Sequence, residues 1–313
     1  MNMKKFLSRF ILFFIPLFII TIVVSVIDPY NYFFHGNFIS DNAKISVINR
    51  SPESMPRGNT LWKSIDFKQH PLQNIIIGDS RAFDLNTDTI AKVSGTEYFN
   101  FGVPGGNFRS VIETFWYIND LVKLDKVYIQ VGFYNYSAGS DYNLMSDAKK
   151  VMRKPYLFFT RFYFFNESLL DVFYSFRHEE QNENRSGDDF DADNWEKVLK
   201  KQGENSINTM RYPENYYKEL KKIAAYCEEN NIELSFIIFP DQEDFHQVIA
   251  DKQKNDLYTR YKADIHSLGK VYDFDVPESK IRDDRSNYRD IFHLKHRLIN
   301  GFIIPSIWGT MQP

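Results

Sequence analysis

Short apolar runs and helical apolar stripes alternate along the chain after residue 70. Five runs have the length and composition of buried strands, at residues 72–77, 97–101, 127–131, 233–239 and 271–274. Residues 107–122 and 216–227 carry apolar side chains at helical spacing, Asn86 or Thr87 can cap a short helix, and residues 290–308 are expected to form a final helix. This alternation predicts an α/β fold, a three-layer sandwich with a central parallel sheet of about five strands.

The most apolar stretch of the chain lies near its N-terminus. Residues 10–27 are 18 uncharged residues, long enough to cross a hydrocarbon core of roughly 30 Å as a helix. Lys4, Lys5 and Arg9 precede this stretch and Asp28 follows it, which predicts a cytoplasmic tail (1–9), a transmembrane anchor (10–27) and an extracytoplasmic remainder. A cleaved signal peptide is the alternative, but the sequence SVIDPY offers no small-x-small cleavage site.

The remainder divides by composition into three parts. Residues 28–69 are mixed and polar, with Pro52 and Pro56, and are expected to form a stalk. Residues 70–313 form the predicted folded domain, interrupted by an insertion at 138–211 that is aromatic and basic in its first half and polar and acidic in its second. We expect a cap that packs over the domain, or a flap that contacts the membrane or a partner.

Composition narrows the function classes. With 38 Lys and Arg against 41 Asp and Glu the formal net charge is −3, so no basic field indicates a nucleic-acid partner. Cys227 is the single cysteine, which excludes an internal disulfide and suits a bacterial surface protein. No zinc or P-loop motif occurs, and Asp189, Asp191 and Asp193 lack the glycine and glutamate of a calcium loop. We therefore expect no metal and no cofactor.

Candidate chemistry follows the predicted strands. Parallel sheets bind ligands beyond the carboxyl ends of their strands, so the residues after each strand should share one rim. That rim would hold GDS (78–80), NFGVPGGN (100–107), GFYNYS (132–137), PDQ (240–242), and finally Asp290 and His293. Ser80 at a strand-to-helix turn can act as a nucleophile if a base removes its proton. The alternative is that Gly, Asp and Ser are ordinary turn and cap residues.

The other rim residues suit the same reaction. His293 can take the proton of Ser80, and Asp290, three residues earlier, can orient the imidazole. The backbone N–H of Gly105 and the side-chain amide of Asn135 are candidate donors to an oxyanion. His296 is a backup base or part of a solvated helix face, and His246 is a substrate contact or a loop histidine.

These residues resemble the SGNH (GDSL-type) hydrolase superfamily over about residues 70–137 and 212–310. GDS at 78–80, NFGVPG at 100–105, GFYN at 132–135 and DIFH at 290–293 match its four blocks, with Arg81 in place of the usual leucine and Tyr134 in the place of the third block's asparagine. The resemblance implies an SGNH or flavodoxin-like fold, Ser80 as nucleophile, His293 as base, Asp290 as its orienter, and Gly105 and Asn135 as oxyanion donors.

With its N-terminal anchor, the chain looks like the membrane-tethered members of that superfamily, the DltD-like and alginate-acetylation proteins that accompany membrane-bound O-acyltransferases. The resemblance implies a serine esterase or O-acyltransferase acting on acyl groups, with acetyl expected, of a cell-surface polysaccharide. The alternative is a catalytically silent module that binds a polysaccharide or an acyltransferase partner. If Ser80 and His293 lie beyond hydrogen-bond reach on fixed loops, the silent module is the better account.

Overall fold

The structure is a computed structural model that describes residues 3–33, 38–50, 56–138, 142–176, 192–277 and 279–309. The chain separates into two compact units. Met1–Gln69 and Ser146–Asn182 make up the first, which we call the helical unit. His70–Met145 and Glu183–Pro313 make up the second, which we call the α/β unit.

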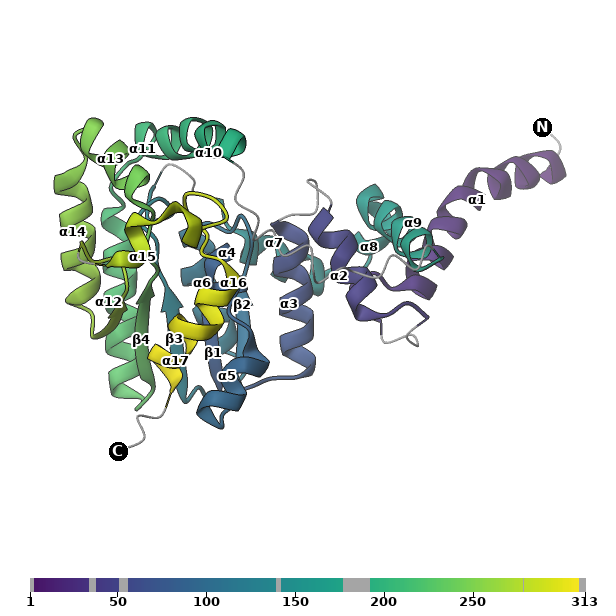
Figure 1. Cartoon of the computed structure of the whole chain (residues 1–313). Helices are drawn as coiled ribbons and strands as arrows, with labels where there is room; N and C mark the ends of the chain where they lie inside the picture. Colours follow the sequence, from purple (N-terminus) through teal and green to yellow (C-terminus); the bar gives the residue numbers. More distant parts are fainter. Residues whose placement is uncertain are drawn as a thin grey trace. The chain divides into compact units, whose positions relative to one another are not determined.

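The α/β unit is built on a five-stranded, all-parallel sheet of order β2-β1-β3-β4-β5 (Figure 1). The strands are β1 (Asn74–Gly78), β2 (Phe99–Gly102), β3 (Lys126–Gln130), β4 (Glu233–Ile238) and β5 (Lys270–Asp273). Because the chain moves from β1 outward to β2 and then returns to β3 on the other side, the sheet has a switch point between β1 and β3, where such sheets bind ligands.

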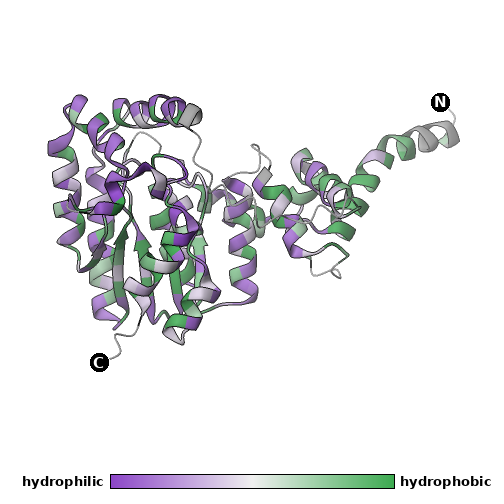
Figure 2. Cartoon of the chain, in the orientation of Figure 1, coloured by the Kyte–Doolittle hydropathy of each residue, from purple (hydrophilic) through white to green (hydrophobic). Residues whose placement is uncertain are grey.

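Helices cover both faces of this sheet. Helices α6 (Phe108–Asn119) and α12 (Glu214–Glu229) pack together on one face, and α5 (Thr87–Ser94) and α17 (Ile304–Trp308) on the other (Figure 1). The strands are hydrophobic and the helices are mixed (Figure 2), because the central strands β1, β3 and β4 are buried on both faces and the helices on one side only. The α/β class and the parallel sheet of five strands are confirmed.

The remaining helices of the α/β unit are short or lie at its edges. They are α4 (Ser80–Phe83), α10 (Ala192–Val198), η1 (Leu199–Glu204), α11 (Asn205–Asn208), α13 (Glu243–Asp251), α14 (Asn255–His266), α15 (Lys280–Asp283), η2 (Arg285–Asn287), α16 (His296–Leu298) and η3 (Ile299–Ile303). Of the two cap residues predicted for α5, the structure selects Asn86, whose side chain accepts a hydrogen bond from the Thr89 N–H at 2.8 Å.

The final helix begins later than predicted. It was expected from Asp290, but helical structure starts at His296 and continues through η3 into α17. The carboxylate of Asp290 accepts hydrogen bonds from the backbone N–H groups of Phe292 and His293, both at 2.9 Å. This local bonding competes with a helix and holds the segment as a turn.

The helical unit corrects the prediction of an irregular stalk at 28–69. That segment contains α2 (Asp41–Arg50) and α3 (Arg57–Gln69), which bury apolar side chains such as Val47, Leu61 and Ile65. The sequence shows no long apolar pattern at helical spacing in this segment. The two helices are stabilised instead by the packing of these scattered apolar side chains. The unit also contains α1 (Met3–Ile27), in which Phe10–Ile27 are long and apolar enough to cross a membrane.

The predicted insertion at 138–211 does not form one cap. Helices α8 (Leu157–Thr160) and α9 (Phe162–Phe176), with most of α7 (Leu144–Arg153), belong to the helical unit, whereas α10, η1 and α11 belong to the α/β unit. The aromatic half packs on the N-terminal helices because their rings interlock, as Tyr30 and Phe164 do at 5.3 Å between centroids. Residues 177–191, with Asp189 and Asp191, lie outside the described residues.

Candidate active site

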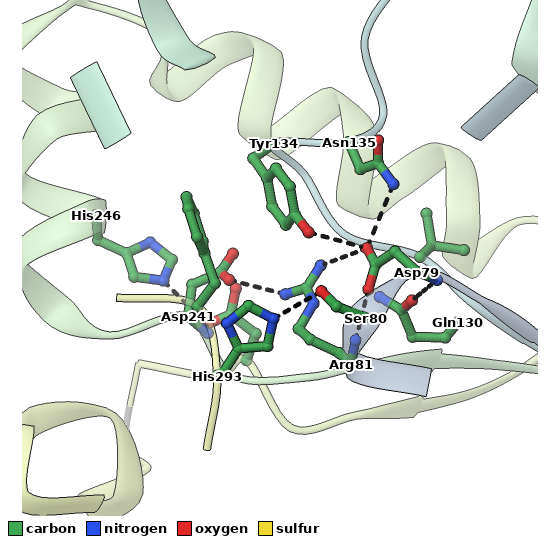
Figure 3. Close-up of polar contacts among 12 residues, drawn as sticks. Asp79, Ser80, Arg81, Gln130, Tyr134, Asn135, Asp241, His246 and His293 are labelled. Atoms are coloured by element: carbon green, nitrogen blue, oxygen red, sulfur yellow. Dashed lines mark hydrogen bonds and ion pairs between the residues drawn. The ribbon is translucent and has the colours of Figure 1, made fainter. Parts of the chain in front are cut away.

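Ser80, His293 and Asp290 come together beyond the carboxyl end of β1, and Figure 3 shows Ser80 and His293 side by side. The distance from Ser80 Oγ to His293 Nε2 is 2.6 Å. His293 Nδ1 lies 2.8 Å from each carboxylate oxygen of Asp290. An ionised carboxylate only accepts hydrogen bonds, so Nδ1 carries the ring proton and Nε2 is left to accept the proton of Ser80. The expected proximity of the three side chains is confirmed.

A short turn between β5 and α16 presents His293 and Asp290. Tyr288 and Leu294 pair as an antiparallel bridge, and the Arg289 N–H donates to the His293 carbonyl at 2.8 Å. The Arg289 guanidinium forms an ion pair with Asp84, which directly follows α4. The turn is thus attached to the same short helix that carries Ser80, which fixes base and nucleophile relative to each other.

The electrostatics of this turn favour the ionised form of Asp290. Burial alone would raise the pKa of Asp290, but the hydrogen bond from His293 and the two backbone N–H donors outweigh burial and lower that pKa below its usual range. The carboxylate is therefore available at neutral pH to orient the imidazole and to stabilise its protonated form.

Two backbone N–H groups at the pocket are open to a ligand. VPGG (103–106) forms a turn closed by the Gly106 N–H on the Val103 carbonyl at 2.9 Å, with Gly105 at a φ of +68°. A positive φ at the third position of a turn is the reason glycine is needed there. Within the described parts of the chain, the N–H groups of Ser80 and Gly105 donate to no protein acceptor. Both residues line the same pocket, so both N–H groups remain available to a ligand.

The amide of Asn135 is already engaged. Its Nδ2 donates to the Gly106 carbonyl at 2.8 Å and lies 3.4 Å from Asp79 Oδ2. Asn135 lines the pocket beside Ser80, but to donate to an oxyanion it must release the longer of these bonds. Its oxyanion role stays a prediction, and its visible role is to hold the glycine turn against the loop after β3.

Tyr134 lines the pocket beside Ser80. Its hydroxyl donates to Asp79 Oδ2 at 3.2 Å, and its ring stacks on Phe292 at 4.3 Å between centroids. Burial, and then the charge of Asp79, raise the pKa of Tyr134, so the phenol keeps its proton and remains a donor. Figure 3 shows the Tyr134 hydroxyl and the Asn135 amide approaching the same carboxylate next to Ser80.

A buried arginine lies directly beneath the nucleophile. The Arg81 side chain is 1% exposed, with Nη1 2.9 Å from Asp241 and Nη2 3.6 Å from Asp79 (Figure 3). Burial by itself lowers the pKa of Arg81, but Asp79 and Asp241 outweigh it and raise the pKa. The space for this guanidinium exists because residue 132 is glycine, where an added Cβ would lie 1.4 Å from Nη2. The loops after β1, β3 and β4 are therefore joined through one cation.

The charged network continues away from the pocket to His246. Burial raises the pKa of Asp241, and the neighbouring Asp275 raises it further. Asp275 receives hydrogen bonds from His246 at 2.9 Å and from the Tyr258 hydroxyl at 2.6 Å. His246, considered above as a substrate contact, is thus a side chain of this network and does not line the pocket. His296 begins α16, where Nε2 lies 3.7 Å from Asp84, and also does not line the pocket.

Ser80 and His293 open into a pocket of about 600 Å³, a size typical of small-molecule sites. Loops of the sheet rim form one side of it: Pro104, Gly105, Gly106, Asn107, Tyr134, Asn135, Tyr142 and Phe292. Polar residues of η1 and α11, with the residue after α11, form the other: Lys201, Gln202, Asn205, Ser206 and Thr209. The second half of the predicted insertion therefore lines the site, as expected of a cap.

Ser80, His293 and Asp290 were predicted from the sequence, but two residues that hold the surrounding loops, Arg81 and Asn100, were not. No role was predicted for Arg81, although it links Asp79 to Asp241. The sequence did contain a sign of this role, because Asp241 follows β4 and Gly132 follows β3 on the same rim, which offers Arg81 a carboxylate partner and space for its side chain. Asn100 was also passed over. Its amide donates to the carbonyls of Ala82 at 2.7 Å and Leu85 at 2.9 Å, which fixes the end of α4.

Comparisons with known proteins add no name to this geometry. No family model matches the chain, and no curated protein matches it either.

Proposed function

We propose that the chain is a membrane-anchored serine esterase or O-acyltransferase with an SGNH-like, flavodoxin-like fold. The observation that supports this most is the 2.6 Å contact of Ser80 Oγ with His293 Nε2, backed by Asp290. A silent binding module is favoured only if these groups lie apart, and they lie within hydrogen-bond reach. The open pocket next to Ser80 gives an ester a place to bind.

The proposed reaction begins with attack of Ser80 Oγ on the carbonyl carbon of an ester. The Ser80 proton passes to His293 Nε2, and the N–H groups of Ser80 and Gly105 stabilise the oxyanion. Collapse of the tetrahedral intermediate breaks the bond to the alcohol oxygen, which leaves with the proton from His293. Water or a sugar hydroxyl then attacks the acyl-Ser80 ester. His293 accepts the proton of that hydroxyl and returns it to Ser80 Oγ as the bond between Oγ and the acyl group breaks.

The proposed substrate is an ester-linked acyl group, with acetyl expected, on a cell-surface polysaccharide. The polar wall from Lys201 to Thr209 supplies amide, hydroxyl and ammonium groups of the kind that bind sugar hydroxyls. The apolar helix Phe10–Ile27 would anchor the chain in the cell membrane with its N-terminus in the cytoplasm. A membrane-bound O-acyltransferase is a proposed partner of the chain.

The proposal is tested with the purified full chain in detergent and an acetylated sugar or aryl acetate as substrate. Ser80→Ala and His293→Ala should each lower kcat by at least about 10³-fold, because each removes a group that the acyl-transfer step requires. Ser137→Ala, at a serine outside the pocket lining, is the matched control and should keep full activity. Unchanged turnover in the Ser80 variant would contradict the proposed function.

A further inference from the structure

Helix α9 has the reverse of the sidedness expected of a water-facing helix. Phe162, Leu169, Phe173 and Phe176 recur at helical spacing on one side, with exposed fractions from 46% to 80%. The opposite side buries Glu167, Ser168 and Asp171, each at most 2% exposed. A helix in water normally places its apolar side toward the core and its charges outward.

The inward-facing charges are held within the helical unit. The Tyr30 hydroxyl donates to Glu167 at 3.1 Å. Lys44, itself 1% exposed, donates to the Asp28 carbonyl at 3.0 Å and to Asn31 at 2.6 Å. The carboxylate oxygens of Asp171 accept no hydrogen bond from any described residue. Ionisable groups turned toward the interior of a helix cluster, with phenylalanine outside, are typical of helices that contact lipid.

Helix α9 lies against the candidate membrane span. Both α8 and α9 pack against α1, and Val24, one turn before the end of the span, is fully buried. The residues just beyond the span hold the start of α9. The Tyr30 ring lies 5.3 Å from that of Phe164 and 6.2 Å from that of Phe158. The fold of the helical unit therefore keeps α9 beside the outer end of α1.

Cations precede α9 at the level expected for lipid headgroups. Lys150, Arg153 and Lys154 are exposed at the end of α7. The Tyr32 hydroxyl, five residues beyond the span, donates to the Met152 carbonyl at 2.8 Å. This contact places the end of α7 just outside the hydrocarbon, where lysine and arginine side chains can bind lipid phosphates.

We propose that α9 is a membrane-embedded interfacial helix, whose Phe162, Leu169, Phe173 and Phe176 side lies in the lipid next to α1. The proposed occupant is the bilayer and not a second protein, because α9 packs against α1, whose own apolar side chains are exposed along the candidate span. An amphipathic helix of this kind is buried by about 5–10 Å at the boundary of headgroups and acyl chains. The chain thus contacts the membrane at two places, α1 and α9.

The test measures which medium surrounds the exposed side of α9. The full chain carries Cys227→Ala, so that a single introduced cysteine takes the nitroxide label. The labelled chain is then reconstituted in vesicles of phosphatidylcholine and phosphatidylglycerol. Labels at Leu169→Cys and Phe173→Cys report on α9. Leu12→Cys in the candidate span is the lipid control, and Lys218→Cys, exposed on α12, is the water control. Collision rates with oxygen and with a water-soluble nickel chelate are compared.

We expect the oxygen-to-nickel ratio at positions 169 and 173 to exceed that at 218 several-fold and to approach that at 12. A ratio equal to that at position 218 would show a water-facing helix and overturn the proposal. Low collision rates with both reagents would show a protein-covered side, such as a second copy of the chain, and would also overturn it. None of these outcomes depends on the chemistry of Ser80, so the proposed function is tested separately.

Discussion

Helices α9 and α12 have nearly the same length, 15 and 16 residues, and opposite sides turned inward. Helix α12 buries Tyr216, Leu220, Ile223 and Cys227 and exposes lysines and glutamates. Helix α9 buries Glu167 and Asp171 beside Phe164 and exposes Phe162, Phe173 and Phe176. The spacing of residues makes both segments helical, but only the surroundings decide which side is buried, so the comparison indicates two different media for the two units.

The two units also bury charge differently. In the α/β unit the Arg81 cation lies between Asp79 and Asp241, and it joins the loops that carry the candidate active site. In the helical unit Glu167 and Asp171 stand one turn apart on α9, turned away from its exposed side. Buried charge supports a site in the first unit, whereas in the second it is kept away from the proposed lipid surface.

The largest expected effect comes from placing the same charge on each helix. Ile223→Asp puts a carboxylate at a position of α12 that is 0% exposed and should lower the free energy of unfolding of the α/β unit by about 4 kcal/mol or more. Leu169→Asp lies in the other unit and should change the free energy of unfolding of the α/β unit by less than about 0.5 kcal/mol, while it weakens the binding of α9 to detergent or lipid. Urea unfolding in detergent, followed by circular dichroism, measures both. Equal losses of unfolding free energy in the two variants would contradict the claim that the exposed side of α9 and the buried side of α12 have different surroundings.

A smaller effect is expected at the buried arginine. Gly132→Ala places a methyl group 1.4 Å from Arg81 Nη2, and the ion pair with Asp241 prevents the guanidinium from moving freely. We expect a loss of about 1–3 kcal/mol in the free energy of unfolding, together with slower acylation of Ser80.

Gly301→Ala is the matched control, because nothing lies within 4 Å of its added Cβ. It should leave stability unchanged or raise it by up to about 1 kcal/mol, since alanine favours a helix over glycine. If Gly132→Ala behaves like Gly301→Ala in both stability and acylation, Arg81 does not link the loops.

The candidate active site and its buried arginine show which features could be predicted from the sequence and which could not. The five strands follow from apolar runs, and the triad from the order of the rims, because both depend on neighbours along the chain. The position of Arg81 under Ser80 depends on Gly132 and Asp241, which approach it only in the folded sheet. The division of the insertion between the units, and the helices in the expected stalk, likewise depend on packing between distant segments.

The smallest expected effect is at Tyr134. Tyr134→Phe keeps the stacking on Phe292 but removes the hydroxyl that donates to Asp79 beside Ser80. We expect kcat to fall by about tenfold, or about 1.4 kcal/mol, with little change in unfolding. Tyr217→Phe is the control. The Tyr217 hydroxyl contacts Ser267 at 3.0 Å and neither residue belongs to the rim, so this variant should keep full activity. Equal rates for both variants would remove Tyr134 from the site.

The central claim is that Ser80 is an activated nucleophile, and intact mass after exposure to a fluorophosphonate tests it most directly. The full chain in detergent is compared with Ser80→Ala, and a third sample carries His293→Ala. The account predicts one adduct on the unaltered chain, none on Ser80→Ala, and strongly slowed labelling of His293→Ala. No adduct on the unaltered chain, or an adduct that persists in Ser80→Ala, would contradict it.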